Sequence, residues 1–140
     1  MTILIDSGAS DSVAPPNAFN AIKVHKTTAS ESGLQYTAAG GHKIDNLGMC
    51  RPQLRMLDGG ACQMAFQVAA VGKVLGAVSR IVGAGNRVVF DATERGGSYI
   101  QCVTTGHVTP LRTHNGVYYL DVWYNPVESK DFQGFQRQAR

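Results

Sequence analysis

Short apolar runs separated by turn-forming residues recur along most of this chain and favour β-strands over helices. The clearest alternation lies in residues 61–70, where Cys62, Met64, Phe66 and Val68 alternate with small or polar residues. We expect these four side chains to line a core. Further strands are predicted at residues 3–5, 12–14, 49–56, 87–90, 98–102, 108–111 and 117–123. This pattern is typical of a mainly β domain.

Helical spacing is convincing in one segment, residues 73–81, where Val74, Leu75, Val78 and Ile81 form one apolar face. The glycines that follow at 83 and 85 are suited to end a helix there. A shorter helical turn is predicted at residues 18–22. Residues 24–33 are mostly polar and small, which predicts a loop or an irregular edge strand.

Glycine-containing turns divide the predicted strands into hairpins. Gly40-Gly41 predicts a slim, mobile hairpin tip within residues 34–44. Asp58-Gly59-Gly60 and Asn115-Gly116 are strong turn signals farther along the chain. The last part of the chain, from about residue 87, therefore reads as a β meander that ends before a polar segment without periodicity.

Composition and charge exclude several classes of function. The chain has 140 residues, 44% of them hydrophobic, which is enough for one ordinary core. A formal charge of +3 with scattered basic residues does not form a nucleic-acid patch. No apolar run is long enough to span a membrane, and the first residues are too few for a signal peptide. We therefore expect an intracellular, cytoplasmic protein that binds neither nucleic acid nor membranes.

Familiar cofactor and metal motifs are missing from the sequence. The three cysteines have no C-x-x-C spacing and are expected as free thiols in a reducing compartment. No phosphate-binding glycine loop, nucleophile elbow or metal-ligand spacing occurs, so we expect no cofactor and no metal. The four histidines fall in predicted turns and are expected as surface residues: His25, His42, His107 and His114.

Asp6 stands out among the acidic residues because it follows an apolar strand and precedes a hydroxyl and a glycine. A carboxylate at the buried end of a strand costs several kcal/mol unless it is paired or shares a proton. That cost favours a chemical role. The alternative is a strand that ends in an ordinary Asp/Ser turn, with Asp6 accepting backbone N–H bonds.

Asp6-Ser7-Gly8-Ala9 resembles the active-site motif of aspartic proteases, in the single-copy form found in retropepsins. The hairpin at residues 36–44 resembles the retropepsin flap. Ala70-Val71-Gly72, before the predicted helix, resembles the hydrophobic-hydrophobic-Gly element of that family. Later segments resemble the region that follows the protease in copia-type retrotransposon polyproteins, namely residues 77–81, 85–90 and 116–121.

The resemblance implies a retropepsin-like closed β-barrel of the acid-protease type with one helix, and the later strands extend it by a C-terminal β meander that ordinary retropepsins lack. We expect three parts: a core over residues 1–86, a meander over 87–124 packed on that core, and a flexible tail over 125–140. It also implies a homodimeric aspartic endopeptidase that acts on an extended peptide or polyprotein. Asp6 would be catalytic and would be supported by Ser7, Gly8 and Ala9. The flap would contribute Ala39, Gly40, Gly41 and His42, and Val71 and Gly72 would lie near the site.

The sequence departs from the family pattern in two places, after the motif's alanine and before Asp6, and each departure leads to an expectation of its own. Many retropepsins have an Asp directly after the motif's alanine, paired with an Arg just after the hydrophobic-hydrophobic-Gly element. Here Ser10 and Lys73 occupy those positions, and Asp11 is the available substitute. The segment before Asp6 is short, which predicts an unpaired edge beside the motif strand.

Two other functions fit the same residues. One is a catalytically silent retropepsin-like module for peptide binding or dimerisation. The other is a small β-barrel binding protein in which the D-S-G triplet arises by chance.

Overall fold

The computed structural model describes residues 1–38, 40–128 and 136–137, and within them the chain is mainly β. In chain order the elements are β1 (Thr2–Asp6), β2 (Val13–Ala14), α1 (Thr28–Glu31), β3 (Gln35–Thr37), β4 (Lys43–Asp45), β5 (Gly48–Cys50), β6 (Pro52–Met56), β7 (Ala61–Gln63), β8 (Phe66–Val68), β9 (Leu75–Ala77), α2 (Val78–Gly83), β10 (Asn86–Val89), a 3₁₀ turn (Thr93–Arg95), β11 (Tyr99–Cys102), β12 (Val108–Pro110), β13 (Arg112–His114), β14 (Val117–Glu128) and β15 (Gln136–Arg137).

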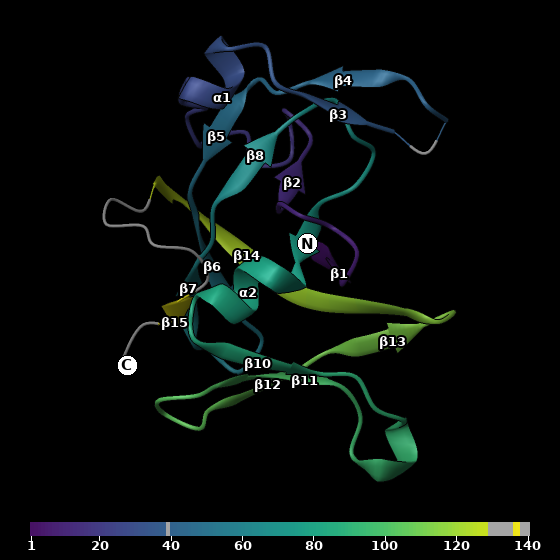
Figure 1. Cartoon of the computed structure of the whole chain (residues 1–140). Helices are drawn as coiled ribbons and strands as arrows, with labels where there is room; N and C mark the ends of the chain where they lie inside the picture. Colours follow the sequence, from purple (N-terminus) through teal and green to yellow (C-terminus); the bar gives the residue numbers. More distant parts are fainter. Residues whose placement is uncertain (39, 129–135, 138–140) are drawn as a thin grey trace.

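The strands form three sheets. A curled ten-stranded sheet has the order β15-β7-β6-β14-β1-β9-β2-β8-β5, with β13 paired to β14. A three-stranded sheet contains β10, β11 and β12, and a two-stranded sheet contains β3 and β4. The β3–β4 hairpin and the three-stranded sheet lie at opposite ends of the molecule, and β14 crosses between them (Figure 1). The large sheet curls like half a barrel, and its end strands β15 and β5 do not pair with each other in the described part.

The core lies inside the curl of the large sheet and is built by alternation along its strands. The predicted inward positions of residues 61–70 are confirmed, since Cys62, Met64, Phe66 and Val68 are all 2% exposed or less. The ladder is broken in the middle of this segment, so two short strands, β7 and β8, replace the single long strand that was predicted. Residues 49–56 are likewise divided into β5 and β6.

The segment predicted as a helical turn at residues 18–22 is not helical. It forms consecutive turns, with hydrogen bonds of 3.1 Å from Ala18 N to Pro15 O and 2.9 Å from Ile22 N to Phe19 O. Phe19 and Ile22 are nevertheless buried, and the Phe19 ring lies 5.3 Å from that of Phe66. Packing of these apolar side chains onto the core determines the path of the chain here, and no helical hydrogen-bond ladder is required.

The predicted helix over residues 73–81 is wrong in its first half. Leu75–Ala77 forms strand β9, and helix α2 covers only Val78–Gly83. Gly76 packs closely against Ile3 and Met64, which places the backbone of this segment against the core as a strand. A short helix not expected from the sequence, α1, is capped by reciprocal bonds between Thr27 and Ser30.

The expectation of an unpaired edge beside the motif strand is also wrong. β1 pairs in parallel with β9 on one side and antiparallel with β14 on the other, where Ile3 lies opposite Leu120. β14 therefore contributes an inner strand of the large sheet, although the sequence placed it in a meander packed on the core. The same strand runs past residue 124 to Glu128, so Asn125 and Glu128 of the predicted tail pair with β6, with a shift of register between them.

Helices of the described residues are short, and none is both long and apolar enough to cross a membrane.

Candidate active site

Asp6 is the last residue of β1, where the strand leaves the large sheet. Burial alternates along β1, so Ile3 and Ile5 point into the core while Thr2, Leu4 and Asp6 share the opposite face. Asp6 is half-buried, and its carboxylate is accessible from the outer face of the sheet. The local pattern of apolar residues thus places a carboxylate at a strand end, as predicted, but this end is half-buried and not buried, so Asp6 does not carry the full cost of a buried carboxylate.

The turn after Asp6 is held by one local hydrogen bond. The backbone N–H of Gly8 donates to Oδ1 of Asp6 over 2.8 Å. Ser7 and Gly8 are exposed and Ala9 is half-buried. An ordinary Asp turn would show the same bond, so this contact alone does not indicate catalysis. Within the described residues, no second carboxylate of the same chain bonds to Asp6.

An ion pair ties the loop after the motif to helix α2. Nε and Nη2 of Arg80 donate to Oδ1 of Asp11 over 3.0 and 2.5 Å. The hydroxyl of Ser79 points to the carbonyl of Ala9 at 3.5 Å. Asp11 thus does have an arginine partner, which lies one turn inside α2 and not at position 73. Sequence reasoning named Asp11 but missed Arg80.

Ser12 is a second residue that sequence reasoning missed. This residue is only 3% exposed, and its hydroxyl oxygen accepts the backbone N–H of Ala77 over 3.0 Å. Ala77 lies directly opposite Asp6 in the β1–β9 pair. Ser12 therefore fixes the strand beside the motif, and a polar residue in the otherwise apolar run 12–14 was the signal available for it.

Val71 and Gly72 do not lie beside Asp6 in the strand ladder. They belong to the connection between β8 and β9, and Gly72 is exposed. The strand that runs parallel to β1 is Leu75–Ala77, with Gly76 opposite Ile5. The hydrophobic-hydrophobic-Gly segment next to the motif is therefore Val74-Leu75-Gly76. Triplets of this kind occur at residues 70–72, 74–76 and 81–83, and among them only 74–76 has a glycine packed into the core.

The hairpin predicted at residues 36–44 is present as β3 and β4. Tyr36 lies opposite Ile44, and the turn is closed by hydrogen bonds of 2.9 Å from Ala38 N to His42 O and 2.8 Å from Gly41 N to Ala38 O. Gly41 has a φ of +85°, which an L side chain rarely adopts. Gly40, Gly41 and His42 are all exposed, and Ala39 lies outside the described residues.

The base of this hairpin is attached close to the Asp11 loop. Nδ2 of Asn46 donates to the Tyr36 hydroxyl over 3.2 Å and to Oε1 of Gln67 in β8 over 3.0 Å. Burial of the ring, followed by the neighbouring Asp11 carboxylate, raises the pKa of the Tyr36 hydroxyl above its usual value of 10.0. The hydrogen bonds of Asn46 therefore fix the base of the hairpin, whose tip is exposed.

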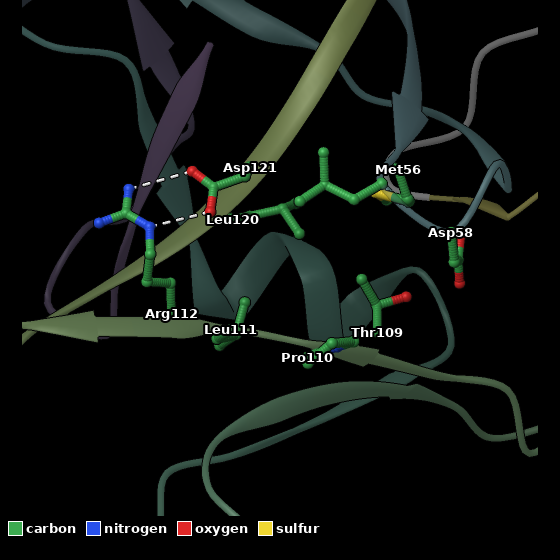
Figure 2. Close-up of a pocket in the computed structure, with 9 residues that line it drawn as sticks. Met56, Asp58, Thr109, Pro110, Leu111, Arg112, Leu120 and Asp121 are labelled. Atoms are coloured by element: carbon green, nitrogen blue, oxygen red, sulfur yellow. Dashed lines mark hydrogen bonds and ion pairs between the residues drawn. The ribbon is translucent and has the colours of Figure 1, made fainter. Parts of the chain in front are cut away.

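A mostly apolar hollow of about 220 Å³ lies between β14, the β6–β7 turn and the segment joining β12 to β13. Figure 2 shows the Arg112–Asp121 pair at one end, Asp58 at the other, and Leu111, Leu120 and Met56 between them. Arg112 donates to both carboxylate oxygens of Asp121 over 2.9 and 3.0 Å. Asp6 is not among the residues that line this hollow.

The described residues contain no cluster of three or more His, Cys, Asp or Glu side chains that could hold a metal ion. Cys50 and Cys62 are buried, Cys102 is half-buried, and no disulfide joins them. His107 lies 2.9 Å from Oδ2 of Asp58 across the surface between the two larger sheets.

Comparisons of the chain with protein-family models, with curated proteins and with solved structures find no match.

Proposed function

We propose that this chain is a retropepsin-like aspartic endopeptidase that works as a homodimer. The observation that carries the proposal is the position of Asp6. It ends a strand flanked on both sides, its carboxylate is accessible, and the loop after it is tied to α2 through Asp11 and Arg80. The exposed glycine-rich hairpin supports the same function, because it supplies a slim element that can close over an extended peptide.

The chemistry requires two carboxylates that share one proton, since two carboxylates a few ångströms apart cannot both stay ionised. One carboxylate takes a proton from a water as the water attacks the peptide carbonyl. The other, protonated, donates to the carbonyl oxygen. One chain brings one such motif, so Asp6 of each protomer meets its counterpart at a two-fold axis.

The remaining site residues have supporting roles in this proposal. Ser7 hydroxyls link the two motif loops across the axis, and backbone groups of Gly8 hold the peptide beside the carboxylates. Closure of Gly40 and Gly41 over the peptide excludes bulk water from the reacting bond. The substrate is an extended segment of a retroelement-type polyprotein, cleaved inside the cell.

The test is cleavage of a broad peptide library at mildly acidic pH, where one proton is shared between the two carboxylates. We expect cleavage that a pepstatin-type inhibitor blocks and that Asp6→Asn lowers by about 10²- to 10⁴-fold. Asp91→Asn is a matched control, because Asp91 pairs with Arg95 outside the proposed site. Full activity in Asp6→Asn would refute the proposal. A purified dimer that binds peptides and cleaves none would identify the silent peptide-binding module instead.

A further inference from the structure

A second hollow, of about 430 Å³, opens on the outer face of the large sheet next to β1. The side chains that define it come from β1, from the connection before β9 and from the β13–β14 hairpin: Leu4, Lys73, Val74, Arg112, His114 and Tyr119. Three segments that are far apart in the sequence therefore meet in it.

The hollow lies on the same face of β1 as the candidate catalytic residue. Leu4 and Asp6 are two residues apart on one strand and point to the same side. Their Cα atoms are separated by about 7 Å, the length of two residues of extended chain. A peptide with its reacting bond at Asp6 that runs along this face of β1 would place a neighbouring residue at the hollow.

The charged side chains that line the hollow are basic, namely Lys73 and Arg112, and none of the described lining residues is acidic. Arg112 is held in place by Asp121, which offsets its charge, and by the Tyr119 ring, whose centroid lies 4.9 Å from the guanidinium carbon. Lys73 forms no ion pair within the part of the chain that the structure describes, so its charge is available to a ligand.

We propose that this hollow is a specificity subsite that accepts an acidic side chain, Asp or Glu, of the peptide substrate. The inference rests on the proposed endopeptidase function. Lys73 supplies the main attraction, and the fixed Arg112 has N–H groups left to donate, because Asp121 uses only two of its five. The apolar side chains of Leu4 and Val74 accept the methylene groups of the bound residue.

The experiment uses pairs of fluorogenic decapeptides that differ only by Glu or Gln at one position, scanned through every position. For the full chain, we expect kcat/KM to favour Glu by about two- to fivefold at one position on one side of the cleaved bond. Lys73→Met lowers this Glu/Gln ratio to about one, whereas Lys23→Met, which removes an exposed lysine outside the hollow, leaves it unchanged. Raising the salt from about 0.05 M to about 1 M reduces the ratio, because an accessible ion pair is screened.

Binding to Asp6→Asn separates this inference from the proposed function. Fluorescence anisotropy with the same peptide pairs measures binding without cleavage. If the wild-type chain cleaves nothing, but Asp6→Asn prefers Glu and loses that preference with Lys73→Met, the endopeptidase proposal fails and the acidic subsite stands. A Glu/Gln ratio near one at every position, an equal ratio in Lys73→Met, or no binding of either peptide would overturn the subsite.

Discussion

Gly76 offers a sharp test of how the motif strand is supported. It is the middle residue of β9, buried, and opposite Ile5 in the parallel pair with β1. A Cβ added to Gly76 would lie 3.1 Å from Cγ2 of Ile3, 3.2 Å from Cδ1 of Ile5 and 3.2 Å from Cε of Met64. All three distances are shorter than ordinary carbon contacts of about 3.5–4.0 Å. Gly76→Ala therefore forces neighbouring side chains to move.

The size of the effect follows from how far those neighbours can move. Ile3 is 0% exposed and Ile5 is 3% exposed, and β-branched side chains have few alternative rotamers. Overpacking a core by one methyl group typically costs about 1–3 kcal/mol. Replacing a glycine within a strand by alanine also raises the free energy of unfolding by about 0.5–1 kcal/mol, because alanine loses less conformational entropy than glycine when the chain folds. We expect Gly76→Ala to lower the free energy of unfolding by about 1–2 kcal/mol in net terms.

Urea denaturation followed by fluorescence of Trp123 measures this change. With a denaturant slope of about 2 kcal/mol/M, the midpoint should fall by about 0.5–1 M. Protein concentration is kept constant, because a dimer couples stability to concentration.

Gly83→Ala is the matched control. Gly83 ends α2, and a methyl group added there would have no heavy atom within 4 Å, so this change should be neutral or stabilising by about 0.5 kcal/mol. An unchanged or higher midpoint for Gly76→Ala would refute the close packing of β9 against β1.

Three further predictions concern the surroundings of the site. Hydrogen bonds from Arg112 hold the pKa of the Asp121 carboxyl below its usual value of 3.8. The ionised carboxylate therefore stabilises the fold above pH 3.8, and this stabilisation is lost as the pH falls below that value. As the pH falls from about 5 to about 2, which crosses 3.8 and the values below it, the urea midpoint of Asp121→Asn should fall less than that of the wild type; an equal fall would contradict the role of this pair. A double-mutant cycle of Asp11→Asn and Arg80→Met should give a coupling free energy of about 0.5–1 kcal/mol, because the pair is accessible to solvent, and a coupling of zero would show that the pair does not stabilise the loop after the motif. Gly41→Ala should lower kcat/KM more than Gly40→Ala, since only Gly41 has a φ of +85°; equal activities would argue that the hairpin tip does not touch the substrate.

Local turn chemistry made several elements predictable from the sequence. Asn115 and Gly116 have φ values of +51° and +75°, and the hairpin they form between β13 and β14 is as predicted. The β3–β4 hairpin around Gly40-Gly41 is likewise confirmed. In both hairpins the strands that pair are neighbours in the sequence, so the turn residues and the flanking apolar pattern contain the necessary information.

Long-range pairing was the part that the sequence could not supply. β14 inserts between β1 and β6, and nothing in its residues distinguishes an inner strand of the large sheet from a peripheral hairpin. The run Val74-Leu75-Gly76 was interpreted as helical because short apolar runs fit both periodicities. Its glycine becomes informative only once Ile3 and Met64 are known to pack on it. For the same reason Arg80 could not be matched to Asp11 in advance.

Activity in mixtures of wild-type and Asp6→Asn chains tests the central claim most directly. The two chains are unfolded together in equal amounts, refolded together so that the protomers combine at random, and assayed with one peptide substrate. If two Asp6 carboxylates form each active site, only dimers of two wild-type chains are active. The mixture then retains about a quarter of the activity of wild-type protein at the same total protein concentration. A mixture that retains about half of that activity would mean that each chain acts alone, and would contradict a site shared across a two-fold axis.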